Sequence, residues 1–342
     1  MILPAIKLDF LETITDDTGI FQHTKFGTPN RREGYTTDDN ARALIALIKY
    51  SYHIRGNSQL NKLINTYLSF LFHMQRKDGK MQNLMSYDRH FLDLEGSEDC
   101  IGRTLWACGC LINSKLSLEK RILAKEIFDK ALPWAPFFKS PRADSCAILG
   151  LTQYHRAHPE DENLIRNTEI LSDRLLNHYE KASSSDWRWF EPYLTYENAR
   201  LPHALYEAYR ETKQKRYLQV AEESLKFLLE VQIINDTFVP IGNKGWYQKG
   251  QARPMYDQQS IEAASMTEAL ISSYRATSNP QYKKTAVTIF NWFLGKNTQN
   301  VVVYNSTTGA CRDGITATGL NLNEGAESNV CYLSARIELE TG

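Results

Sequence analysis

Acidic side chains recur in this chain beside aromatic, amide and arginine side chains, at positions where helices are expected to begin. Residues 34–42 combine two threonines with the adjacent carboxylates Asp38 and Asp39 and then Arg42. Residues 197–200 repeat residues 39–42 almost letter for letter, and looser copies occupy residues 97–103, 256–259 and 324–328. Paired carboxyl groups are side chains that can act as a general acid and a general base. The repetition suggests one shared purpose for five helix starts.

Helix capping is the alternative interpretation of each single copy. Asp, Ser and Thr at a helix N-terminus satisfy free backbone N–H groups and complement the helix dipole. Asp39 with Arg42, and Asp99 with Arg103, also have the spacing of stabilising helical ion pairs. Capping accounts for one or two acids per helix, but it leaves the recurring aromatic, amide and arginine side chains unexplained.

Composition and charge are those of an ordinary globular protein. The chain has 342 residues, of which 42% are hydrophobic and 23% charged, and its formal net charge is zero. This balance gives no sign of electrostatic capture of nucleic acid or an anionic membrane. No run approaches the roughly 18 apolar residues of a membrane span. We therefore expect neither a nucleic-acid partner nor a membrane partner.

Cysteines, histidines and the first residues bear on compartment and cofactors. The six cysteines form no CxxC pair, and several lie in apolar runs, which is typical of buried free thiols in a reducing compartment. The first ten residues include Pro4, Lys7 and Asp9 and lack the apolar core of a signal peptide. We expect a cytoplasmic protein. The eight histidines show no metal-binding spacing, so we expect no metal and no cofactor.

Hydrophobic periodicity predicts a series of helical hairpins. Apolar helices rich in small residues alternate with amphipathic ones, and the apolar members recur about every 57 residues, a period typical of repeated hairpin units. We expect six inner helices, about six outer ones, and one all-α (α/α)6 toroid domain spanning residues 1–342. The expected helices cover residues 5–14, 38–54, 59–75, 97–111, 118–132, 141–157, 161–181, 215–232 and 280–295, with others starting near residues 196, 257 and 324.

The toroid would bring the acidic motifs together. In this arrangement the N-termini of all inner helices point to one end, so the five motifs meet around one mouth. The long loops 76–95, 183–195, 233–256 and 297–323 precede inner helices and would reach the same end. Long loops in compact domains are usually functional.

At this point the sequence resembles the six-hairpin glycosidase superfamily across nearly its whole length. Residues 34–42 and 324–329 also look like a family of bacterial (α/α)6 proteins labelled glycosyltransferase-associated or glycosidase-like. The superfamily resemblance implies a substrate cleft at the N-terminal ends of the inner helices, where carboxylates act on glycosidic bonds. The catalytic candidates that it implies are Asp38, Asp39, Glu98, Asp99, Asp257 and Glu327.

Aromatic, arginine and amide side chains near these acids are the candidates for substrate binding. Aromatic rings can stack on sugar faces, and arginines can bind hydroxyl groups or orient acids. His203 is the ambiguous member, because a lone histidine is more often structural. The candidates are Tyr35, Arg42, Arg103, Trp187, Trp189, Tyr196, Glu197, Asn198, Arg200, His203, Trp246, Tyr256, Gln258, Arg312 and Asp313.

The main functional prediction is a glycoside hydrolase that acts on an oligosaccharide or glycoside at the toroid mouth. A non-catalytic carbohydrate-binding or scaffold protein, working beside a glycosyltransferase, is the second hypothesis. The third is a sugar epimerase or isomerase. Epimerases on similar toroids use histidines for proton transfer, and the inner-helix starts here are rich in acids and poor in histidine. Lyase chemistry on acidic glycans would require a more basic cleft.

Overall fold

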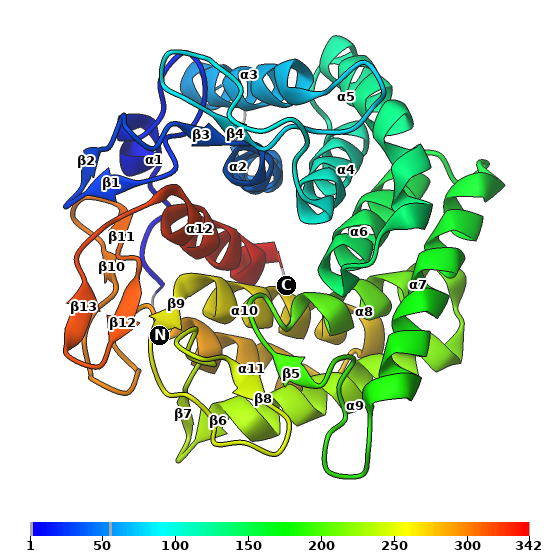
Figure 1. Ribbon diagram of the computed structural model, residues 1–342, viewed down its shortest axis with the longest axis vertical. Coiled ribbons are helices and arrows are strands. Elements are labelled where there is room, and N and C mark those ends of the chain that lie inside the picture. The colour runs from blue at the N-terminus through cyan, green and yellow to red at the C-terminus, as the bar shows by residue number, and fades with distance from the viewer. Residues whose placement is uncertain (1–2, 55–56, 342) are drawn as a thin grey trace.

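Six inner helices close into a ring in the computed structural model, which describes residues 3–54 and 57–341. Residues 1–2, 55–56 and 342 of the predicted domain lie outside the described part. Each inner helix contacts the next, and the last contacts the first, so the ring is continuous (Figure 1). The inner helices are α2 (Thr37–Ser51), α4 (Glu98–Ile112), α6 (Pro141–Ala157), α8 (Arg200–Thr212), α10 (Ser260–Thr277) and α12 (Ala326–Thr341).

The outer helices pack on the inner ring and complete the hairpins. Five of them follow an inner helix directly and contact it, while the five-residue α1 (Asp9–Thr13) contacts α12 in the twelfth place. This confirms the predicted all-α (α/α)6 toroid. The inner helices are buried almost all round because they meet two inner neighbours and an outer helix. The other outer helices are α3 (Ser58–Met74), α5 (Leu118–Ala131), α7 (Glu162–Ala182), α9 (Lys215–Gln232) and α11 (Pro280–Phe290), and the 3-10 helix η1 (Leu132–Phe137) follows α5.

Close helix contact explains the small residues of the inner ring. A Cβ atom added to Gly109 of α4 would lie 2.2 Å from the carbonyl oxygen of Gly150 in α6. A Cβ atom on Gly150 would lie 2.4 Å from the carbonyl oxygen of Leu105. The two backbones therefore touch across both glycines, which fixes α4 beside α6 at the ring wall.

Several predicted helix boundaries are wrong. Helix α10 begins at Ser260 rather than near residue 257, and α2 ends at Ser51 rather than at residue 54. Helix α8 begins at Arg200 rather than near residue 196, because Glu197 adopts a left-handed conformation with φ of 51° in a turn before the helix. Helix α11 ends at Phe290 rather than near residue 295, where the chain enters turns. Helix α1 is half the predicted length.

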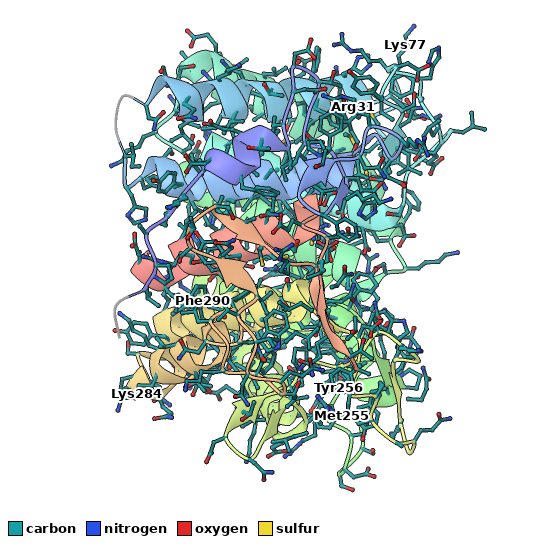
Figure 2. All side chains as sticks on the ribbon, turned by 90° about the vertical axis from the view of Figure 1, so that its left-hand side faces the viewer. Arg31, Lys77, Met255, Tyr256, Lys284 and Phe290 are labelled. Atoms are coloured by element: carbon teal, nitrogen blue, oxygen red, sulfur yellow. The ribbon has the colours of Figure 1, made fainter. Side chains whose placement is uncertain are left out.

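Short antiparallel strands tie the loops together at one end of the ring. Arg31, Lys77 and Tyr256, from three different loops, lie at this end, opposite Lys284 of α11 (Figure 2). Because several pairs join loops of different hairpins, they brace the mouth of the toroid. The pairs are β1 (Thr24–Lys25) with β2 (Thr28–Pro29), β3 (Tyr35–Thr36) with β4 (Leu84–Met85), β5 (Tyr193–Leu194) with β8 (Tyr247–Gln248), β6 (Ile233–Ile234) with β7 (Thr237–Phe238), β10 (Tyr304–Asn305) with β11 (Ala310–Cys311), and β12 (Gly314–Thr316) with both β9 (Gln258–Gln259) and β13 (Gly319–Asn321).

Candidate active site

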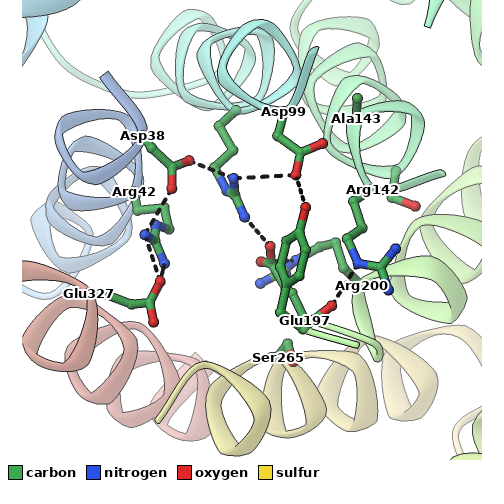
Figure 3. A network of polar contacts seen from close by, with 12 residues as sticks. Asp38, Arg42, Asp99, Arg142, Ala143, Glu197, Arg200, Ser265 and Glu327 are labelled. Atoms are coloured by element: carbon green, nitrogen blue, oxygen red, sulfur yellow. Dashed lines mark hydrogen bonds and ion pairs between the residues drawn. The ribbon is translucent and has the colours of Figure 1, made fainter. Parts of the chain in front are cut away.

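Reciprocal capping fixes the start of α2 and gives its two adjacent acids, Asp38 and Asp39, different surroundings. The hydroxyl of Thr36 accepts a hydrogen bond from the backbone N–H of Asp39 at 3.0 Å and donates one to the Asp39 carboxylate at 2.7 Å. Asp39 is 4% exposed. The side chain of its neighbour Asp38 keeps 24% exposure and points into the ring (Figure 3). Capping therefore accounts for Asp39, and Asp38 is the member of the pair that faces the mouth.

The asparagine side chains of the repeated motif donate hydrogen bonds to backbone carbonyl groups. The side-chain amide of Asn40 donates to the carbonyl oxygen of Thr36 at 2.7 Å. Asn198 donates to the carbonyl of Thr195, and Asn329 to that of Gly325, each at 2.7 Å. The same residue type thus closes the first turn at three inner-helix starts. This explains why asparagine recurs beside the acids.

Arg42 gathers three carboxylates at the mouth. Its guanidinium bonds the carboxylates of Asp38 at 3.0 Å and Asp39 at 3.0 Å within α2, and reaches Glu327 in the first turn of α12 at 3.1 Å (Figure 3). Both terminal nitrogens of Arg42 bond the same oxygen of Glu327. Within residues 3–54 and 57–341 the other oxygen of Glu327 accepts no hydrogen bond, and this side chain is 41% exposed.

Arg103 holds Asp38 from the opposite side. Its guanidinium lies 2.6 Å from the second oxygen of Asp38 and also pairs with the buried Glu197. Asp99 is farther from it, at 3.9 Å, and accepts hydrogen bonds from the hydroxyls of Tyr196 and Ser140. Asp38 thus lies between two arginines, with a hydrogen bond from Arg42 and an ion pair with Arg103.

Burial and charge set opposite protonation behaviour for Asp39 and Glu197. Burial raises the pKa of Asp39 to about 6, with the charges of Asp38 and Glu327 adding to the effect and Arg42 opposing it. Burial also acts to raise the pKa of Glu197, but the guanidinium groups of Arg103 and Arg200 outweigh it and lower this pKa to about 2. Glu197 therefore remains charged across the physiological range.

Two adjoining cavities occupy the mouth. The first has a volume of about 320 Å³ and is walled on one side by β12 and β13; we call it the hairpin chamber. The second, of about 360 Å³, is lined by Tyr196 and Trp246; we call it the aromatic chamber. The residues that line both chambers, and so mark the neck between them, are Asp38, Asn83, Asn243, Gln259 and Glu327.

Eleven of the predicted site residues line these chambers. The hairpin chamber alone takes Asp39, Arg42, Asp257, Gln258 and Asp313. The aromatic chamber alone takes Asp99, Arg103 and Trp246, together with the predicted stacking residue Tyr196. Only Asp38 and Glu327, among the predicted residues, line both.

The remaining predicted residues lie elsewhere. Glu98 accepts hydrogen bonds from the backbone N–H groups of Lys139 and Ser140, just before α6, and lines neither chamber. Tyr35 is buried with its hydroxyl on Asp16, and Arg312 pairs with Glu324 at 3.1 Å. Tyr256 is half-buried and packs against the core. Glu197, Asn198, Arg200 and His203 are buried beneath the mouth.

His203 lies deep in the ring. Its Nδ1 atom is 2.9 Å from the guanidinium of Arg200, and its ring meets Trp106 edge-on. Burial and the charge of Arg200 lower the pKa of His203 to about 4. A neutral, buried imidazole that lines neither chamber has the features of a structural histidine.

Trp187 and Trp189 are core residues. Trp187 is 3% exposed and donates its indole N–H to the backbone oxygen of Glu191, while Trp189 is fully buried against Phe190 and Phe227. Trp189→Ala is expected to lower the free energy of unfolding by about 3–5 kcal/mol, because a buried aromatic ring is lost. Trp246→Ala, at the half-buried chamber wall, should cost clearly less. Urea unfolding of both variants compares them, and equal losses would contradict this distinction.

Several lining residues escaped prediction because they come from loops. Asn83 accepts a hydrogen bond from the backbone N–H of Asp38 at 3.3 Å, and it lines the neck together with Asn243 and Gln259. Gln22 and His23 line the hairpin chamber. Asn83 and Asn243 lie in loops, which carry no helical periodicity, so the sequence offers no signal for them beyond the length of the loops. Gln259 lies in β9, at the end of the acidic motif of residues 256–259, where only its neighbours were predicted.

Neither a metal-binding cluster nor a membrane-spanning helix is present in the described residues. No cluster of three or more His, Cys, Asp or Glu side chains in residues 3–54 and 57–341 is arranged to hold a metal ion. No helix in the same residues combines the length and apolar character needed to cross a bilayer.

Comparisons with known proteins place the fold. No protein-family model matches the sequence, and no curated protein matches it. Among solved structures, the chain is similar to a cellobiose 2-epimerase from Bacillus thermoamylovorans, with a TM-score of 0.76, 12% identity and coverage of 98% of this chain and 95% of that one. A D-mannose isomerase gives a TM-score of 0.73 at 13% identity, covering 97% and 94%. A GH76 α-mannanase from Bacteroides thetaiotaomicron gives 0.67 at 12% identity, covering 97% and 93%. The chain therefore shares its (α/α)6 toroid fold with these proteins.

Proposed function

We propose that this protein is a carbohydrate-active enzyme that hydrolyses a glycosidic bond at the toroid mouth, with Asp38 and Glu327 as its two carboxyl groups. The observation that carries this proposal is their position in the neck between two chambers. A glycosidic bond between two sugars, one in each chamber, would pass between these side chains. The solved structures to which the chain is similar include a GH76 α-mannanase, which supports hydrolysis as the class of reaction.

The site offers the elements that hydrolysis requires. One carboxyl group protonates the leaving oxygen and the other activates water or attacks the anomeric carbon. Asp38 pairs with both Arg42 and Arg103, whereas Glu327 keeps one oxygen open to the cavity. Asp39, with both oxygens engaged by Thr36 and Arg42, acts as a positioning residue behind Arg42.

A turnover screen tests this proposal. Wild-type protein is incubated with neutral oligosaccharides of varied sugar and linkage, and new reducing ends are measured. Asp38→Asn, run in parallel, shows whether any product depends on the neck. Release of reducing ends by wild type alone supports the proposal, and release by both proteins to the same extent contradicts it.

A sugar epimerase or isomerase is the second candidate, because the cellobiose 2-epimerase and the D-mannose isomerase fit the chain with higher TM-scores than the mannanase does. The lining of the mouth counts against it. His23 is the one histidine among the residues that line the two chambers in the described part of the chain, whereas carboxyl groups are numerous. An epimerase would exchange a sugar C–H proton with solvent deuterium, and hydrolysis would not.

Three expectations extend the proposal to the whole protein. We propose that residues 1–342 form one domain, that the protein works in the cytoplasm, and that it associates with a glycosyltransferase. The hydrolase proposal depends on none of them.

A further inference from the structure

The aromatic chamber is built differently from the hairpin chamber. Tyr196 and Trp246 lie on one wall with ring centroids 6.4 Å apart and ring planes tilted by 50°. The rest of the lining is polar, apart from Ile261. The hairpin chamber has no aromatic side chain among its described lining residues, and instead offers carboxyl, amide and hydroxyl groups. An apolar ring surface on one side only suits the face of a sugar.

Tyr196 is preorganised for such a contact. Its hydroxyl donates to the Asp99 carboxylate at 2.6 Å, and the guanidinium of Arg142 lies 4.8 Å from its ring centroid. Trp246 lies in the loop between β7 and β8 with φ of 51°, so it reaches the chamber from a different hairpin. A fixed aromatic surface costs less conformational entropy on binding than a mobile one.

The charge of the two chambers restricts the ligand. Six carboxyl groups but two guanidinium groups line them, and both guanidinium groups are already paired with carboxylates. An anionic sugar would meet like charge in a partly desolvated site, which is strongly unfavourable. The hydroxyl groups of an uncharged sugar can instead donate hydrogen bonds to lining carboxylates such as that of Asp257.

We propose that the mouth binds an uncharged disaccharide, or a longer neutral chain, with one sugar in each chamber, and that Tyr196 and Trp246 form the stacking surface for the sugar in the aromatic chamber. Each chamber has the volume of a small ligand pocket. This inference rests on the proposed function for the position of the bond to be cleaved, but the binding it describes does not require turnover.

Calorimetric titration tests the stacking surface without relying on catalysis. The probes are neutral gluco-, galacto- and manno-configured disaccharides in both anomeric linkages, the matching monosaccharides, and uronate-containing disaccharides. Wild type is expected to bind at least one neutral disaccharide at least about tenfold more tightly than its monosaccharides, and no uronate-containing one with comparable affinity. Trp246→Ala is expected to remove this tenfold preference. Trp134→Ala is the matched control, because Trp134 lies outside both chambers, beside Lys80.

The outcomes separate this inference from the proposed function. Loss of the preference in Trp246→Ala, with normal binding by Trp134→Ala, supports the stacking surface even if wild type cleaves nothing, in which case only the hydrolase proposal fails. Unchanged disaccharide binding by Trp246→Ala overturns the inference even if wild type is an active hydrolase. Failure of every neutral disaccharide to bind, or tighter binding of the uronate-containing ones, also overturns it.

Discussion

Replacing Asp38 by asparagine or Glu327 by glutamine is expected to lower kcat on a cleaved glycan by at least about 100-fold, with the fold retained. Each substitution keeps the size of the side chain but removes a group that can carry a proton or a negative charge. General acid–base catalysis by one positioned group contributes about 10²–10⁴-fold. Because both carboxyl groups act on the same bond, the double variant should lose little more than the worse single variant.

Glu98→Gln is the matched control for these two variants. Glu98 also lies in the first turn of an inner helix, but its carboxylate accepts backbone N–H groups before α6 rather than lining a chamber. We expect Glu98→Gln to keep kcat within about threefold of wild type, since an amide oxygen can still accept a hydrogen bond. Full activity in Asp38→Asn and Glu327→Gln, or a large loss in Glu98→Gln alone, would contradict the assignment of Asp38 and Glu327 as the catalytic carboxyl groups.

Glu197→Ala is expected to lower the free energy of unfolding by about 3–5 kcal/mol. Removing one member of a buried ion pair leaves an uncompensated charge in the core. Glu197 is 1% exposed and pairs with Arg103 and with Arg200 at 2.9 Å, so two buried guanidinium groups each lose one of their carboxylate partners. Urea unfolding near pH 7 measures the loss. Glu126→Ala removes an exposed i,i+4 partner of Lys130 and should change the stability little.

The same variant carries a pH signature. The folded pKa of Glu197 is about 2, below its ordinary value of 4.5, so its stabilising effect is fully present above pH 4.5 and is lost as the pH falls towards 2. The difference in unfolding free energy between wild type and Glu197→Ala should therefore shrink over this window. A difference that stays constant from pH 5 to pH 3 would show that the carboxylate charge is not the source of the stability.

The helical hairpins could be predicted from the sequence because each helix has its own hydrophobic periodicity. Residues 141–157 carry a proline at the first position and a continuous small, apolar surface, and α6 has these bounds. The start of α8 could not be predicted from the sequence. The backbone N–H of Glu197, which has a left-handed conformation, donates a hydrogen bond to the carboxylate of Glu262 in α10. A tertiary hydrogen bond of this kind overrides a capping pattern that works at residue 39.

The residues of the candidate site could be predicted only where they lie on helices. The repeated acids identified the inner-helix starts, but nothing in the spacing separates Asp38, which faces the neck, from Glu98, which caps the next hairpin. The cluster at residues 186–191 has the composition of a sugar-binding surface, yet both tryptophans are buried in the core. Burial depends on how the loop packs on α9, and the composition of the loop does not determine that.

Proton NMR of wild-type protein with a neutral disaccharide in deuterated water is the most direct test of hydrolysis at this mouth. The substrates are those that bind in the titration. We predict loss of the interglycosidic anomeric signal and growth of the α and β anomeric signals of one new reducing end, with the sugar C2 protons retained. Loss of a C2 proton signal while the glycosidic bond stays intact would contradict the account and identify the protein as an epimerase or isomerase instead.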